Sequence, residues 1–118
     1  MGLKDCYEEM GADYESVLAR FGSEQLICKF LKKYFEKDEY EVLEKAVTEE
    51  NWGEAFMYAH NMKGFGLNLS LTEFSEAGSV LCEALRAGEP KGDVNAMLSH
   101  IRGVYVRMEK AVSALEVE

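Results

Sequence analysis

The stretch Asp93–Leu115, DVNAMLSHIRGVYVRMEKAVSAL, has the most regular helical pattern in the chain. Its apolar residues return every three or four positions, which places them on one face of a helix. They are Val94, Met97, Leu98, Ile101, Val104, Tyr105, Met108, Val112 and Leu115. At 1.5 Å per residue this helix is roughly 34 Å long. The stretch therefore predicts a helix that spans the full height of a helical bundle.

The segment before it shows the same spacing of three and four residues. Its seam positions are Leu71, Phe74, Gly78, Leu81 and Leu85. We expect this helix to begin at a capping box formed by Ser70 and Glu73 and to end at Gly88, before Pro90. The small residue in the middle of the seam indicates that two helix backbones pack closely there.

Helix start signals divide the first half of the chain. Ser23 is expected to cap a helix that runs to about Glu36, and Asp38 with Glu41 is expected to begin the next one. Asn51, with Glu54 at the matching offset, is expected to cap a third helix, in which Trp52 is the first buried anchor. The opening segment Leu3–Met10 is expected to form a short helix across one end of the molecule.

These segments together define the expected fold class. The chain has one proline and no run of alternating β-branched residues, so the whole of it is predicted to be helical with short turns. At 118 residues it is expected to form a single domain, residues 1–118. Long helices joined by short turns predict an all-α, antiparallel up-and-down four-helix bundle with a short N-terminal helical segment.

Charge and cysteine content exclude several classes of function. With 22 acidic and 13 basic residues the net charge is −9, which argues against a nucleic-acid surface. The three cysteines have neither metal-type nor redox-type spacing, so they are expected to be reduced and structural. Because no signal peptide or stretch of transmembrane length is found, we expect a cytoplasmic protein with no membrane partner.

The stretch Ala59–Ser70, AHNMKGFGLNLS, asks for a chemical explanation. Each glycine in a helix interior costs roughly 1 kcal/mol relative to alanine, so Gly64 and Gly66 weaken this helix unless the missing side chains serve a need such as close approach by another molecule. On a helical projection with Ala59 at the centre of the apolar face, His60 lies at the border of the buried stripe. We therefore expect a partly held, partly exposed imidazole with open space on its outer flank.

The order His60, Lys63, Gly64, followed by Asn68, resembles the signature of histidine-containing phosphotransfer (HPt) domains. The resemblance extends from about Ser23 to about Leu115. Members of this family are helical bundles that pass a phosphoryl group to and from the aspartate of a receiver domain. The resemblance implies a phosphorelay protein whose partner is the receiver of a response regulator, a hybrid histidine kinase, or both. It implies a phosphocarrier without independent turnover and without a cofactor of its own, because the receiver supplies the Mg²⁺ site.

The resemblance also assigns roles to individual residues. His60 is the expected phosphorylated residue, and Lys63 and Arg86 are expected to stabilise the phosphoryl group. Partner access and docking are expected at Gly64, Asn61, Phe65 and Leu67. Asn68 and Cys82 are the remaining motif positions. Relatives often have Glu or Gln where this chain has Cys82, and the thiol is a weak hydrogen-bond partner for the imidazole.

Phe65 is open to two interpretations. It lies on the far side of the helix from the apolar stripe, so it is either a core aromatic or an exposed apolar contact for a partner.

Other interpretations remain open for the chain as a whole. A carboxylate-bridged metal bundle requires Glu-x-x-His pairs, but Met57 precedes His60 by three positions and Met97 precedes His100 in the same way, so no metal site is expected. His100 is expected to be a surface residue. The alternatives to phosphotransfer are an HPt-fold adaptor that binds a receiver or kinase without being phosphorylated, and a plain helical scaffold.

Overall fold

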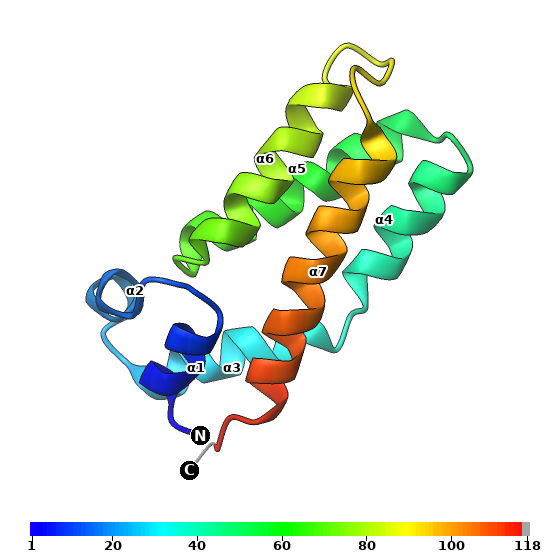
Figure 1. The fold of residues 1–118 in the computed structure, drawn as a ribbon. Helices are drawn as coiled ribbons and strands as arrows, with labels where there is room; N and C mark the ends of the chain where they lie inside the picture. The colour runs from blue at the N-terminus through cyan, green and yellow to red at the C-terminus, as the bar shows by residue number, and fades with distance from the viewer. Residues whose placement is uncertain (117–118) are drawn as a thin grey trace.

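Residues 1–116 are described by a computed structural model, and they are helical with short connections and no β-strand. The helices are α1 (Leu3–Glu9), α2 (Tyr14–Phe21), α3 (Glu24–Phe35), α4 (Glu39–Thr48), α5 (Trp52–Asn68), α6 (Thr72–Leu85) and α7 (Val94–Ser113). The molecule is elongated, with principal extents of 44 × 22 × 18 Å. Figure 1 shows α4, α5, α6 and α7 side by side along its length, and α1, α2 and α3 at one end. The all-α prediction is confirmed.

The long helices pack against one another as neighbours. α5 contacts α6 and α4, while α7 contacts α6 and α4. The predicted apolar face of α7 is buried, as Val94, Leu98, Ile101, Val104, Tyr105, Met108 and Val112 all lie in the core. Met97 is half-buried, and Leu115 is buried just beyond the end of the helix. The helical periodicity of this stretch is therefore explained by burial.

The predicted helix starts have mixed outcomes. The Ser23 hydroxyl accepts a hydrogen bond from the Leu26 N–H, and the Asn51 side chain accepts one from the Glu54 N–H, as predicted. The predicted helix start at Asp38 is confirmed in position, since Asp38 is the N-cap residue of α4, but the capping box is wrong, because Asp38 has φ +51° and its side chain makes no capping hydrogen bond. The α3 and α4 helices are consequently separate, with the break between Phe35 and Glu39.

The predicted Ser70–Glu73 capping box is also wrong. The residue at the N-cap of α6 is Leu71, and no side chain caps this helix. Ser70 has φ +57°, in the left-handed region, and its hydroxyl donates to the Ser16 hydroxyl at 2.9 Å. Ser70 therefore serves the turn after α5 and the contact with α2. The α6 helix ends at Leu85, before the predicted Gly88.

The N-terminal segment is more structured than predicted. The α1 helix agrees with the expected helix at Leu3–Met10, but α2 was not foreseen. The α2 helix begins where the Asp13 carboxylate accepts from the Ser16 N–H, and it ends at Gly22, which has φ +69°. Arg20 of α2 reaches the end of α5, where its Nη1 donates to the carbonyl oxygens of Leu67 (2.9 Å) and Asn68 (2.5 Å). A cation thus binds the carbonyl end of the helix, where the helix dipole favours positive charge.

Two glycines allow α5 and α6 to approach closely. A Cβ added to Gly66 of α5 would be 2.8 Å from the backbone nitrogen of Ser75. A Cβ added to Gly78 of α6 would be 3.1 Å from the backbone nitrogen of Lys63 and 3.3 Å from the carbonyl oxygen of Ala59. The prediction that backbones pack closely at Gly78 is confirmed, and this packing brings α6 next to the His60 segment.

Two further observations concern membranes and cysteines. Among residues 1–116, no helix is long and apolar enough to cross a membrane.

Cys6, Cys28 and Cys82 are all buried as free thiols. Burial raises the pKa of the Cys6 thiol to about 12, so this residue stays protonated and unreactive in the folded protein.

Candidate functional site

The helix that contains His60 is fixed at its start by reciprocal hydrogen bonds. The Asn51 side chain accepts from the Glu54 N–H at 3.3 Å, and its Nδ2 donates to the Glu54 carboxylate at 3.0 Å. Trp52 is half-buried and packs against the core, so it anchors the first turn less deeply than predicted. Ala55, Ala59 and Met62 are fully buried along the inner face of α5. This buried face sets the rotation of the helix and therefore the direction of its outer side chains.

His60 is exposed on the outer side of α5. Its imidazole stacks on the ring of Phe56, one turn earlier, with a centroid distance of 6.2 Å and an interplanar angle of 13°. Phe56 itself is half-buried and packs against the core. Within residues 1–116, neither ring nitrogen of His60 takes part in a hydrogen bond. The expectation of a partly held, solvent-facing imidazole is confirmed, and Phe56 is the residue that holds it.

The surface beside His60 is open. A Cβ added to Gly64 would meet nothing within 4 Å, which confirms the predicted free space one turn beyond the imidazole. Asn61 is exposed, and two apolar side chains flank the region on the same helix: Met57 is 54% exposed and Leu67 is 56% exposed. This side of α5 is therefore exposed around His60 and Gly64.

Charged side chains from α5 and α6 lie next to this surface. The Arg86 guanidinium binds the Glu83 carboxylate, with Nη2 at 2.7 Å and Nε at 3.1 Å from Oε1. The guanidinium carbon is also 5.7 Å from the centroid of Phe56, a cation–π geometry. His60 and Arg86 thus contact the same aromatic ring, although they come from different helices.

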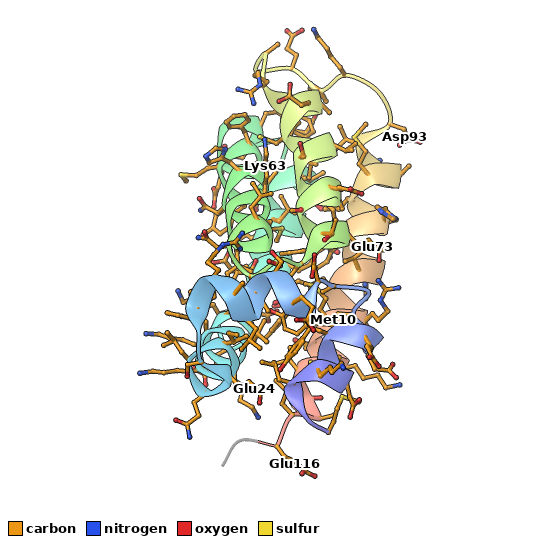
Figure 2. The ribbon with its side chains drawn as sticks, turned by 90° about the vertical axis from the view of Figure 1, so that its left-hand side faces the viewer. Met10, Glu24, Lys63, Glu73, Asp93 and Glu116 are labelled. Atoms are coloured by element: carbon orange, nitrogen blue, oxygen red, sulfur yellow. The ribbon has the colours of Figure 1, made fainter. Side chains whose placement is uncertain are left out.

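Lys63 belongs to the same charged group. Its side chain is half-buried. Figure 2 shows Lys63 far from Met10, Glu24 and Glu116, which lie toward the other end of the molecule. The hydrogen bonds from Arg86 lower the pKa of the Glu83 carboxyl, and the positive charges of Arg86 and Lys63 lower it further. Glu83 therefore stays ionised, with two cations in its surroundings.

Cys82 lies one turn before Arg86 on α6 and is fully buried. It is a free cysteine and belongs to the hydrophobic core. Cys82 contributes to the packing of α6 under the site and leaves the imidazole without a side-chain partner from this helix.

The structure favours one of the two interpretations of Phe65. The residue lies on the far side of α5 from the buried stripe, but its ring is half-buried and stacks on Tyr34 with centroids 3.7 Å apart and an interplanar angle of 9°. Tyr34 of α3 therefore covers the Phe65 ring on this side of α5. Phe65 is thus one of the aromatics that pack against the core. Asn68 is the last residue of α5, and its carbonyl oxygen is held by Arg20.

Sequence reasoning missed the contributions of Phe56 and Glu83. Phe56 lies four residues before His60, a spacing that places the two side chains next to each other on a helix. Glu83 lies three residues before Arg86, a spacing typical of a helical ion pair. Both contacts are visible in the sequence as spacings, but neither spacing shows that the two pairs meet at one ring.

The second histidine lies elsewhere. His100 of α7 is exposed, as predicted, at a shallow groove of about 400 Å³ between α6 and α7. The groove is lined by Glu73, Glu76, Ala77, Val80, Ala96, Met97 and His100. In the part of the chain that the structure describes, no cluster of three or more His, Cys, Asp or Glu side chains is arranged to hold a metal ion.

Comparison with known proteins gives no match: no family model matches this chain, and no curated protein or solved structure matches it significantly. The function proposed below is therefore supported by the resemblance of the His60 motif and by the geometry of this chain's own residues.

Proposed function

We propose that this protein is a histidine phosphotransfer protein of a two-component phosphorelay. His60 would accept a phosphoryl group from the aspartyl phosphate of a receiver domain and donate it to another receiver. The observation that supports this most directly is the exposed imidazole, which is stacked on Phe56 and followed one turn later by open space at Gly64. A phosphoryl acceptor must be reached by another protein, and this histidine can be reached.

The fold that we infer for this function is an antiparallel up-and-down four-helix bundle formed by the long helices, with a short N-terminal helical segment. Its support is the packing of α5 between α4 and α6, and of α7 against both α6 and α4 (Figure 1). In such a bundle the outer face of α5 projects away from the core. A rigid helix therefore holds the reacting nitrogen at a fixed position for the partner.

The transfer step needs little chemistry from this chain. The lone pair of a neutral imidazole nitrogen attacks the phosphorus atom, a new N–P bond forms, and the P–O bond to the receiver's aspartate breaks so that the carboxylate leaves. Such transfer passes through a loose transition state, and positioning and charge neutralisation lower its barrier. The receiver would supply Mg²⁺, while Lys63 and Arg86 would offer positive charge to the phosphoryl oxygens. The chain would be a phosphocarrier without independent turnover.

The docking surface that we infer is the open side of α5. Gly64 gives access, Asn61 offers polar contacts, and Leu67 offers an exposed apolar side chain next to the reacting histidine. Phe65 contributes indirectly, since its stack on Tyr34 fixes α5 against α3. The receiver of a response regulator or of a hybrid kinase would bind here.

Incubation with a phosphorylated receiver domain tests the proposal. We expect label on the protein that is labile in acid and stable in base, as phosphohistidine is. The His60→Gln variant should lose this label, and the matched His100→Gln variant should retain it, because both histidines are exposed but the proposed acceptor is His60. Label that persists in His60→Gln would reject this site.

One observation favours a second candidate, an adaptor of the same fold that binds a receiver or kinase without being phosphorylated. The motif position at which relatives often have Glu or Gln is here the buried Cys82, whose thiol cannot orient the imidazole as a carboxylate or amide would. Binding of a receiver without transfer would support the adaptor. If none of the receivers tested binds the protein or transfers a phosphoryl group to it, the remaining interpretation is a helical scaffold.

A further inference from the structure

The contact between Arg86 and Glu83 gives the site a feature beyond the residues that would touch a phosphoryl group. Arg86 has two partners: the Glu83 carboxylate, which its Nη2 approaches at 2.7 Å, and the Phe56 ring, 5.7 Å from its guanidinium carbon. The same ring stacks on His60. Glu83 therefore determines where the guanidinium lies relative to the imidazole when no phosphoryl group is present.

This ion pair is exposed, and exposed ion pairs exchange partners easily. The Arg86 and Glu83 side chains are 55% and 59% exposed, and they are three residues apart on one helix. Pairs of this kind contribute little to folding stability because water and salt screen them. A phosphoryl group on His60 would have a charge close to −2, more than the single charge of a carboxylate. The guanidinium would then be drawn from Glu83 toward the phosphoryl oxygens.

Glu83 also affects the second cation of the site. Its carboxyl pKa is lowered first by the Arg86 hydrogen bonds, and the charge of Lys63 contributes to the same shift. In the unphosphorylated protein one carboxylate thus neutralises part of the positive charge that both cations would offer. Since the carboxylate stays on the same helix after transfer, it would also repel the phosphoryl oxygens.

We propose that Glu83 is a positioning residue that holds Arg86 on Phe56 in the unphosphorylated protein and lowers the affinity of the site for a phosphoryl group. This inference rests on the proposed role of His60. Its consequence is a balance: cations stabilise phosphohistidine, and the competing carboxylate keeps this stabilisation small enough for the phosphoryl group to leave again. Glu83 acts through Arg86, so removing Arg86 should remove its effect.

The two exposed histidines permit a test that needs no receiver. Potassium phosphoramidate phosphorylates accessible imidazoles: its P–N bond breaks, ammonia leaves, and the phosphorus bonds to a ring nitrogen. With the reagent limiting, so that neither histidine is saturated, the ratio of phosphorylated His60 to phosphorylated His100 is followed by ³¹P NMR until it is constant, with His60→Gln and His100→Gln to assign the signals. His100 serves as a reference within the same molecule, because it lies on α7 and not beside Glu83.

The variants form a double-mutant cycle. We expect Glu83→Gln to raise the His60:His100 ratio by about two- to fivefold, the range of an exposed ion pair, and Arg86→Met to lower it. In the Arg86→Met background, Glu83→Gln should change the ratio by less than half of its effect in the wild type. Glu8→Gln is a control for the loss of one negative charge. Glu8 is exposed on α1, at the other end of the molecule, so this substitution should leave the ratio unchanged (Figure 1).

Two results would overturn the role of Glu83: an unchanged ratio in Glu83→Gln, or an equally large increase in the Arg86→Met background. The latter would mean a general charge effect. The proposed function is judged separately by transfer from a phosphorylated receiver. A receiver that fails to phosphorylate His60 while the cycle behaves as expected would reject the relay and keep the Glu83–Arg86 interaction. If a receiver phosphorylates His60 but the cycle does not behave as expected, the relay is kept and the proposed role of Glu83 is rejected.

Discussion

Gly66 of α5 lies directly against Ser75 of α6, since a Cβ at position 66 would be 2.8 Å from both the backbone nitrogen and the Cβ of Ser75. Gly64, two residues earlier on the same helix, has open space around it. The two glycines of the motif therefore have different physical roles. One allows two helices to touch, and the other leaves the outer surface free.

The first prediction compares alanine at these two positions. Gly66→Ala should lower the free energy of unfolding by about 1–3 kcal/mol, because the added methyl group meets backbone atoms that cannot move independently. Gly64→Ala should instead raise it, by up to about 1 kcal/mol, because alanine favours a helix interior and nothing obstructs it. Urea denaturation of both variants measures the difference, and a change of the same sign in both would contradict the assignment.

The second prediction separates access from stability at Gly64. If a receiver must approach this side of α5, Gly64→Ala should slow transfer from a phosphorylated receiver by about tenfold or more, because a small displacement of reacting atoms is costly. Phosphorylation by phosphoramidate, a small reagent, should be nearly unchanged. An equal loss with both donors would show that the substitution disturbs His60 itself and does not block the partner.

The third prediction concerns the two side chains that follow Gly64 on opposite sides of α5. Phe65→Ala should destabilise the protein by about 1–3 kcal/mol, because it removes a half-buried ring and its stack on Tyr34. Leu67→Ala should alter stability by less than about 0.5 kcal/mol, because the side chain is largely exposed, but it should weaken receiver binding. Thermal unfolding and a receiver titration distinguish them. A stable Phe65→Ala protein with weak receiver binding would return Phe65 to the docking surface.

The fourth prediction is a pH dependence caused by Glu39. Burial raises the pKa of the Glu39 carboxyl in the folded protein, and its Oε2 is buried without a hydrogen-bond partner among residues 1–116. The folded state therefore binds this proton more tightly than the unfolded chain does, so stability is lost as the pH rises through the folded pKa. Below the unfolded pKa, about 4.3 for Glu, both states are protonated and the group has no such effect.

Glu39→Gln tests this sign. Its free energy of unfolding relative to wild type should increase as the pH is raised above about 4.3, the pKa of Glu in an unfolded chain, because burial opposes ionisation of the wild-type carboxyl in the folded state. Denaturation at a series of pH values measures the difference. A difference between the two proteins that stays constant with pH, or one that grows toward acid, would contradict a raised pKa at this position.

Local signals in the sequence predicted much of the fold. The apolar face of α7, the Asn51 cap of α5 and the exposed position of His60 follow from residues within a few positions of one another, and all three agree with the structure. The open space at Gly64 was predicted for the same reason, because a residue on the outer face of a helix meets only solvent unless another element covers it.

Other features depend on which surfaces meet, and no local pattern contains that information. Phe65 stacks on Tyr34 of α3, so a projection of α5 alone could not decide between its two interpretations. Ser70 forms a left-handed turn that contacts Ser16 of α2, and this contact prevails over its local capping signal. The capping of α5 by Arg20 joins residues 47 and 48 positions apart.

The sequence by itself determined that the chain is helical, where most of its helices begin, and which histidine stands at the edge of a buried face, because helix formation and capping depend on neighbours in the chain. Only the tertiary structure decided what surrounds that histidine. Phe56, Glu83 and Arg86 meet beside His60 because α5 and α6 pack closely at Gly66 and Gly78, and this packing depends on the shapes of two helix surfaces together.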